Sequence, residues 1–346
     1  SLVLLTGRST ELRNEGHLDN MVSRETVFLL NNLLLTAFTF TVLLGTMFPL
    51  LAEAFRGEKV SVGAPFFNQM TVPICAALLF LVGVGPMLPW RVASMEELKR
   101  KLRLPGGALL LVLIATLAVG VRDFWGVVAF SFAAFAATAN LQEFAQGTAA
   151  RRRASGGSPV SAFFGLVNAN PRRYGGYMAH LGLIMSAIGM TGSAVLKSDI
   201  VSTVRPGQAV ELGGYTVRFD DLFADDQPHR FVVGANLTVL IDGEPAGRMD
   251  PRLNYYRMRG GEDAITTPSV RSRAHEDLYV NLLAFAQDGT TATLHVIIEP
   301  LVVWIWIGSF VVAFGALVSM VGGRRRRTPP VVHRAPREQL VEAGVT

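Results

Sequence analysis

The chain has 346 residues, of which 50% are hydrophobic and only 17% are charged, whereas a soluble globular domain carries about 25% charged residues. This deficit argues against an ordinary soluble protein and indicates a membrane protein. The formal net charge of +5 comes from arginines beside apolar stretches, which is typical of topology signals and not of a nucleic-acid-binding face, and the single cysteine excludes a disulfide framework and a CxxC motif.

Six stretches are apolar and long enough to cross a bilayer, for which about 20 residues are needed. The third and fourth are separated only by "VRDFWG", which predicts a tight helical hairpin. The fold expected is therefore a polytopic α-helical membrane protein. The six predicted spans are 28–54, 69–90, 105–121, 123–141, 175–196 and 300–322.

Lysine and arginine gather on one side of these spans, whereas the other side has only Arg56, Lys59 and Arg122 in its short connections. The positive-inside rule then predicts that both ends of the chain are cytoplasmic and that 197–299 lies outside. The residues of the basic side are Arg8, Arg13, Arg24, Arg91, the run "ELKRKLR", Arg151 to Arg153, Arg172 and Arg173, and Arg324 to Arg327.

The outer segment 197–299 reads as a small all-β domain inserted between the last two spans. Its strings "TVRFDDLF", "FVVGANLTVLIDG", "LYVNLLAF" and "TATLHVIIE" are rich in β-branched and aromatic residues and are separated by Gly, Pro and Asp, which predicts short strands. The acidic run "FDDLFADD" is expected to be a solvated loop; the alternative is a docking patch for a basic partner.

The remaining segments are expected to be cytoplasmic. Residues 1–27 are expected to be cytoplasmic, with the end of an earlier span at their start, whereas 28–141 hold the first four spans in the membrane. We expect 142–174 to be a loop with a flexible Gly/Ser linker and an interfacial stretch "VSAFFGLV". The Pro- and Arg-rich tail 323–346 is expected to be disordered.

His180 is the only histidine in a predicted span. A polar ring in hydrocarbon without a partner costs several kcal/mol, so an intramembrane ionisable residue is a functional candidate by default. The alternative is a structural histidine that is hydrogen-bonded to a neighbouring helix.

The helix around His180 has two distinct faces. A small-residue stripe predicts close packing on a neighbouring helix, and at 100° per residue His180 points nearly opposite to it. The face of His180 also carries Arg173, Tyr177, Ile184, Ala187 and Thr191. The stripe consists of Gly175, Ala179, Gly182, Ser186, Gly189 and Ser193.

A flat apolar cofactor with a central metal would cover the second face, because imidazole is a standard axial ligand of haem iron. We therefore predict a cofactor site with His180 as metal ligand and Tyr177 beside it. Arg172 and Arg173, one to two turns towards the cytoplasm, are candidates for binding haem propionates. The alternative is that these arginines are only positive-inside signals.

From Ser23 to Gly315 the chain contains, in order, a set of strings that resembles the CcmF family of cytochrome c maturation proteins. The set is specific as an ordered series, although no single string is diagnostic. The strings are "SRETVFLLNNLLL", "VLLGTMFPLLAEA", "VSVGAPFFN", "VGVGPMLPWR", "NPRRYGGYMAHLG", "HEDLYVNL" and "EPLVVWIWIG".

The resemblance implies a haem lyase of the bacterial inner (cytoplasmic) membrane, with the outer β domain in the periplasm. That family works with CcmH-type partners, takes haem from CcmE and attaches it by thioether bonds to the CxxCH motif of apocytochrome c. It also holds a haem b between two transmembrane histidines. The second of these belongs to the motif "RRYGGYxxHLG", which falls on His180.

The chain also departs from the family pattern. The tryptophan-rich WWD segment, its two flanking histidines and the first haem ligand belong to an amino-terminal half that is absent here. We therefore expect a fragment or a split subunit, a haem-lyase component that is incomplete without its other half. Two alternatives remain open: a haem or small-molecule permease, and a membrane scaffold that docks periplasmic maturation partners.

Overall fold

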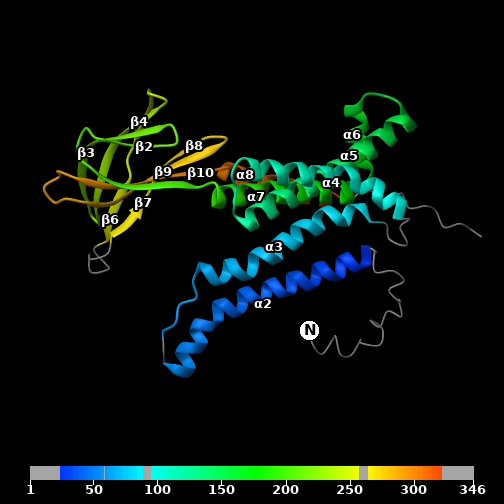
Figure 1. Ribbon diagram of the computed structural model, residues 1–346, viewed down its shortest axis with the longest axis horizontal. Coiled ribbons are helices and arrows are strands. Elements are labelled where there is room, and N and C mark those ends of the chain that lie inside the picture. Colours follow the sequence, from blue (N-terminus) through cyan, green and yellow to red (C-terminus); the bar gives the residue numbers. More distant parts are fainter. Residues whose placement is uncertain (1–23, 58, 89–94, 257–263, 322–346) are drawn as a thin grey trace, which may run out of the picture.

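The computed structural model of the chain describes residues 24–57, 59–88, 95–256 and 264–321. A helical part and a β domain follow each other along the long axis of the molecule (Figure 1). Residues 1–23 of the predicted amino-terminal segment and the predicted tail 323–346 lie outside the described residues.

The six predicted spans are confirmed as six helices that are long and apolar enough to cross a membrane. A shorter helix, α6 (Pro159–Ala169), lies between the fourth and fifth of them. The long helices are α2 (Arg24–Arg56), α3 (Ala64–Met87), α4 (Met95–Ala118), α5 (Phe124–Ser155), α7 (Pro171–Val195) and α8 (Val302–Met320).

The segment 142–174, expected as a loop, is largely helical, so that expectation is wrong. Helix α5 continues to Ser155, and α6 fills most of the rest. The break between them is short: Gly156 and Gly157 have φ values of 70° and 90°, a region that favours glycine. Ser158 then caps α6 by accepting a hydrogen bond from the Ser161 amide at 3.2 Å. Hydropathy marks only where a helix can cross lipid, whereas the helix itself continues until a residue breaks it.

The predicted tight hairpin between the third and fourth spans is confirmed. Helix α4 ends at Ala118 and α5 begins at Phe124. Asp123 is the N-cap of α5, and its carboxylate accepts a hydrogen bond from the Gly126 amide at 2.6 Å. A capping carboxylate satisfies an orphan amide and complements the helix dipole, so this turn is locally encoded.

Helices α7 and α8 pack backbone to backbone through the predicted stripe. A Cβ atom added to Gly182 would lie 2.5 Å from the Val312 nitrogen and 2.6 Å from the Gly308 oxygen. A Cβ atom added to Gly315 of α8 would likewise lie 2.5 Å from the Ala179 nitrogen. Such close approach is the usual mode of helix association in membranes, and it assigns the stripe face of α7 to α8.

Helix α3 packs on α5 in the same manner at one position. A Cβ atom on Gly83 would lie 2.8 Å from the Ala136 Cα atom. The Asn140 amide of α5 also donates hydrogen bonds to the carbonyls of Val82 (3.2 Å) and Ala136 (2.8 Å). These contacts hold α3 and α5 together next to the cavity described below.

Between α7 and α8 in chain order the chain forms two antiparallel sheets. One has the order β1-β10-β9-β8 and the other β2-β3-β4-β6-β7, with β5 paired to β4. The strands are β1 (Ser198–Val204), β2 (Ala209–Leu212), β3 (Tyr215–Gln227), β4 (Arg230–Ile241), β5 (Glu244–Met249), β6 (Arg252–Tyr256), β7 (Ala264–Thr267), β8 (Ser269–Ser272), β9 (Glu276–Phe285) and β10 (Ala292–Pro300).

The four strands predicted from composition are confirmed as β3, β4, β9 and β10, and both sheets contribute to one hydrophobic core. The side chains of Phe219, Leu237, Leu278 and Val296 are fully buried in it. Alternation along β3 and β4 places one face of each strand in this core, as expected for antiparallel sheets with one solvated face.

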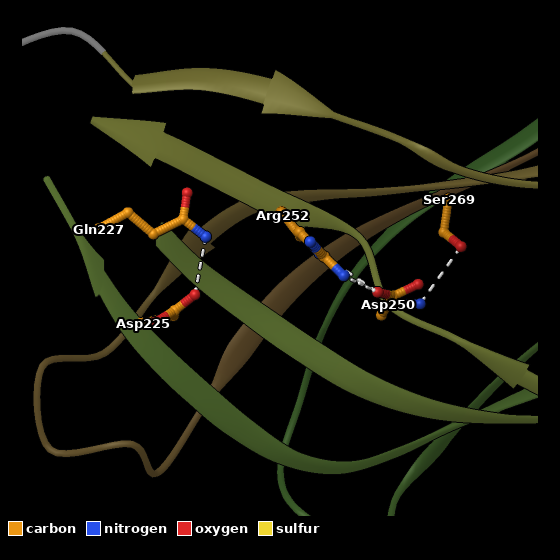
Figure 2. Close-up of polar contacts among 5 residues, drawn as sticks. All are labelled: Asp225, Gln227, Asp250, Arg252 and Ser269. Carbon is orange, nitrogen blue, oxygen red and sulfur yellow. Dashed lines mark hydrogen bonds and ion pairs between the residues drawn. The ribbon is translucent and has the colours of Figure 1, made fainter. Parts of the chain in front are cut away.

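The acidic run lies in strand β3 and not in a loop, so that expectation is wrong. The Asp221 carboxylate accepts a hydrogen bond from Asn236 of β4 at 2.7 Å, and Asp225 accepts one from Gln227 at 2.8 Å (Figure 2). Arg252 at the start of β6, which pairs with β4, forms an ion pair with Asp250 just before that strand, and the Asp250 amide donates to the Ser269 hydroxyl (Figure 2). Each of these three carboxylates therefore accepts from a nearby side chain.

The β domain is attached to the helices at one sheet edge. Strand β1 follows α7 and strand β10 precedes α8, and Ser198 pairs with Ile298. Lys197 and Glu299 form an ion pair of 3.8 Å at this junction, and the Leu301 amide donates to the His275 carbonyl at 2.9 Å. The entry and exit of the domain are therefore neighbours.

Candidate functional site

A cavity of about 620 Å³ opens among five helices of the bundle. Its volume lies in the range typical of small-molecule and cofactor sites, which is roughly 300–1,000 Å³. One end is charged and most of the remaining wall is apolar. The lining residues are Val27, Phe28 and Asn31 of α2; Leu81, Val82, Gly85, Pro86 and Leu88 of α3 and its end; Lys101 of α4; Glu143 of α5; and Arg173, Gly176, Tyr177 and His180 of α7.

His180 lines this cavity from the face of α7 that turns away from α8. Its Nδ1 atom is buried, and within the described part of the chain it has no hydrogen-bond partner. Buried polar atoms are nearly always paired in native structures. The structural alternative, a histidine bonded to a neighbouring helix through Nδ1, therefore finds no support among the described residues.

The carboxy-terminal part of the same face of α7 is covered by other helices. Ile184 is almost completely buried among Leu79 of α3 and Ala133 and Ala136 of α5, and Ala187 packs against the same cluster. The sequence alone left this whole face in need of a cover. The structure divides this face into two parts. The carboxy-terminal part packs on α3 and α5, and the amino-terminal part, with His180, lines the cavity.

Arg173 and Tyr177 lie together on the amino-terminal part of this face. The guanidinium of Arg173 donates from Nε to the Tyr177 hydroxyl at 3.1 Å and from Nη2 to the Glu143 carboxylate at 2.7 Å. It also stacks over the Tyr177 ring at 5.5 Å from the ring centroid. The position of Arg173 is thus set from two helices.

Arg172 is placed differently. It is exposed, and it does not line the cavity. Its carbonyl accepts a hydrogen bond from Ser319 of α8 at 3.4 Å. The structure therefore brings together His180, Tyr177 and Arg173 but leaves Arg172 on the outside.

Three polar residues of the lining were not predicted from sequence to belong to the site, namely Asn31, Lys101 and Glu143. A signal for the last two was present in the α4–α5 hairpin. In an antiparallel hairpin, residues at similar distances from the turn lie at the same level, and Lys101 and Glu143 stand roughly equally far from "VRDFWG". Which of the charged residues near these helix ends face inward was not visible from that spacing.

Across the described residues, no group of three or more histidine, cysteine, aspartate or glutamate side chains is arranged to hold a metal ion. A metal bound at His180 would therefore need most of its ligands from a prosthetic group or from another chain. A porphyrin supplies four nitrogen ligands and leaves the axial positions to the protein, so one imidazole is the donor set that such a group requires from this chain.

No family model matches the sequence. Individual relatives do match it over nearly its whole length. The chain is 32% identical to the cytochrome c-type biogenesis protein CycK of Bradyrhizobium diazoefficiens over 97% of its residues and 50% of the relative. It is 31% identical to the cytochrome c-type biogenesis protein CcmF of Pseudomonas aeruginosa over 88% of its residues and 45% of the relative.

A solved structure described as "Cytochrome c Heme Lyase CcmF" has the same fold. It superposes with a TM-score of 0.69 at 29% identity, over 88% of this chain and 46% of the other. The chain spans about half the length of the relatives that it matches. It is a homologue of the CcmF family of cytochrome c-type biogenesis proteins, and the carboxy-terminal half predicted from its motifs fits that match.

Proposed function

We propose that this chain is part of a haem lyase for c-type cytochrome maturation and that it holds a haem b in the membrane at His180. The names of the relatives and of the structural neighbour support the lyase assignment. Two observations carry the haem assignment: His180 lines the cavity, and its buried Nδ1 atom has no hydrogen-bond partner among the described residues, so no protein hydrogen bond at Nδ1 explains the imidazole.

The residues of the cavity fit a flat apolar group with acidic substituents. Val27, Leu81 and Pro86 give apolar walls, and the charged end carries two cations, Lys101 and Arg173. A bound haem would supply the redox-active iron, and the protein would tune it through the axial ligand and the polarity around it.

Each polar residue then has a defined part. The His180 imidazole would hold the iron, and the apolar walls from α2 and α3 would keep water away from it. Arg173 presents a cation to a carboxylate, and Tyr177 holds that guanidinium in place through its hydroxyl. With about 1.5 Å of rise per residue, Arg173 lies roughly 10 Å along the helix from His180, which separates the acidic end of the ligand from its metal.

The membrane orientation and the partners extend this proposal. The arginine bias supports a periplasmic β domain and cytoplasmic chain ends. In that position the β domain can meet CcmE-type and CcmH-type proteins and the CxxCH segment of apocytochrome c. The other half of the family pattern would supply the second histidine that holds the haem.

The test is an absorption spectrum of membranes that contain this chain together with its other half. The wild-type assembly should show a b-type Soret band. Replacement of His180 by Ala should abolish or shift the band, and added imidazole should restore it. The control is Leu183→Ala on the same helix, because Leu183 is exposed. An unchanged spectrum in His180→Ala rejects the ligand assignment.

A further inference from the structure

The charged end of the cavity contains three ionisable residues from three helices, namely Lys101 of α4, Glu143 of α5 and Arg173 of α7. Two are cations and one is a carboxylate. If Glu143 is ionised, this end carries one positive charge in excess. An uncompensated charge beside apolar walls is costly in a membrane protein. A bound group with a negative charge would remove this cost.

Glu143 forms an ion pair with Arg173. The Glu143 side chain is only 11% exposed and accepts from Arg173 at 2.7 Å. Arg173 also donates to the Tyr177 hydroxyl. In contrast, no ion pair or hydrogen bond of Lys101 is found among the described residues, and Lys101 is partly buried in the cavity wall. The excess charge therefore resides on Lys101.

We propose that Lys101 binds a carboxylate of the molecule that occupies this cavity, next to Arg173. This inference rests on the proposed function, in which that molecule is a haem held at His180. It moves one acidic group of the ligand from Arg172, which is outside the lining, to a lysine of a different helix. An ammonium group and a carboxylate in a partly buried setting form a charge-assisted hydrogen bond, and their attraction offsets the cost of removing both from water.

The two cations differ in how far their side chains are restrained. Arg173 is restrained by Glu143 and Tyr177 and keeps a single position. Lys101 has a flexible four-carbon stem and no fixed partner among the described residues, so it can adjust to the ligand. The haem carboxylates therefore meet one rigid and one adaptable cation.

The experiment compares two probes on the full chain assembled with its other half: haem with free propionates, and haem dimethyl ester. Wild-type protein should bind the free acid more tightly. Lys101→Met should lose about tenfold of that preference, the size of one partly exposed charge-assisted contact. Lys101→Arg should keep most of it. Lys99→Met is the matched control, because Lys99 is exposed on the same helix and should leave the preference unchanged.

The outcomes separate this inference from the proposal beneath it. If wild-type protein shows no His180-dependent haem binding, the proposed function and this inference both fail. If His180-dependent binding is present but Lys101→Met retains the full preference for the free acid, the inference fails and the haem site stands. A loss of binding for both probes in Lys101→Met, with the preference unchanged, indicates a general structural effect and also overturns the inference.

Discussion

At the scale of single residues, the site depends on two kinds of polar group in an apolar surrounding. His180 has a buried nitrogen without a described partner, whereas Arg173, Glu143 and Tyr177 satisfy one another. A satisfied group stabilises the protein by itself, but an unsatisfied one costs free energy until something binds it. This difference separates the residues that hold the site together from the residue that we propose as the ligand of the metal.

The Arg173–Glu143 pair leads to an asymmetric prediction. Arg173 is 54% exposed at its side chain, whereas Glu143 is only 11% exposed. Arg173→Met leaves a nearly buried carboxylate without its partner, which costs about 3 kcal/mol, while Glu143→Gln leaves a guanidinium that water can reach. Arg173→Met should therefore destabilise the protein more, and the double variant should recover part of the loss.

Unfolding of the detergent-solubilised protein, followed by helical circular dichroism, measures this difference. A double-mutant cycle isolates the pair from other effects of each change. Equal losses for the two single variants would mean that burial of Glu143 does not control the energetics of the pair.

At the scale of elements, the small residues of α7 and α8 fix the position of His180. The stripe on one face brings the two backbones into contact, and this contact turns the opposite face of α7 towards α2, α3 and α5. Lipid tails are as apolar as helix side chains, so the hydrophobic effect does not drive two helices together in the membrane. Close packing of small residues decides which helices associate. The rotation of α7 is thereby set by glycines that never touch the site.

Gly182→Val should separate α7 from α8. Its Cβ atom would lie 2.5 Å from the Val312 nitrogen and 2.6 Å from the Gly308 oxygen. These are backbone atoms that cannot rotate aside, and overpacking of this kind costs about 1–3 kcal/mol. The matched control is Gly107→Val in α4, where an added Cβ meets nothing within 4 Å.

Resistance of the folded protein to unfolding by SDS in mixed micelles reports this change. We expect a lower midpoint for Gly182→Val and no loss for Gly107→Val, since Val is a better helix former than Gly. A similar midpoint for both variants would show that the α7–α8 contact does not need its small residues.

At the scale of the whole molecule, the chain consists of two bodies joined at one edge. The helices have few internally buried residues, while the β domain has its own core made by both sheets. The strands at its entry and exit are hydrogen-bonded neighbours, with Ser198 opposite Ile298. Both connections therefore arrive at one place, as in domains that tolerate insertion between two elements of another fold.

Residues 197–300 should fold alone as a soluble domain. Heat unfolding followed by far-ultraviolet circular dichroism should give one cooperative transition, as is usual for a small single core. Val239→Asp, which buries an unpaired charge in that core, should abolish the transition. Val270→Asp should retain it, because Val239 is fully buried and Val270 is 45% exposed. Absence of a transition in the wild-type domain would show that the β domain needs the helices to fold.

The sequence by itself determined the properties that depend on local patterns. Hydropathy located six spans, β-branched strings located four strands, and the periodicity of small residues marked the face of α7 that packs on α8. Each of these follows from residues close together in the chain. The same local patterns missed the extension of α5 to Ser155, because polar helical turns carry no hydropathy signal.

Only the tertiary structure decided which charged residues line the same cavity. Lys101, Glu143 and Arg173 belong to three helices, and nothing near each residue shows which way it turns or which helix lies beside it. It also separated Arg172 from Arg173, two adjacent residues with the same charge. Side chains one position apart on a helix point about 100° away from each other, so the packing of α7 on α8 and α5 brings one into the cavity and leaves the other outside.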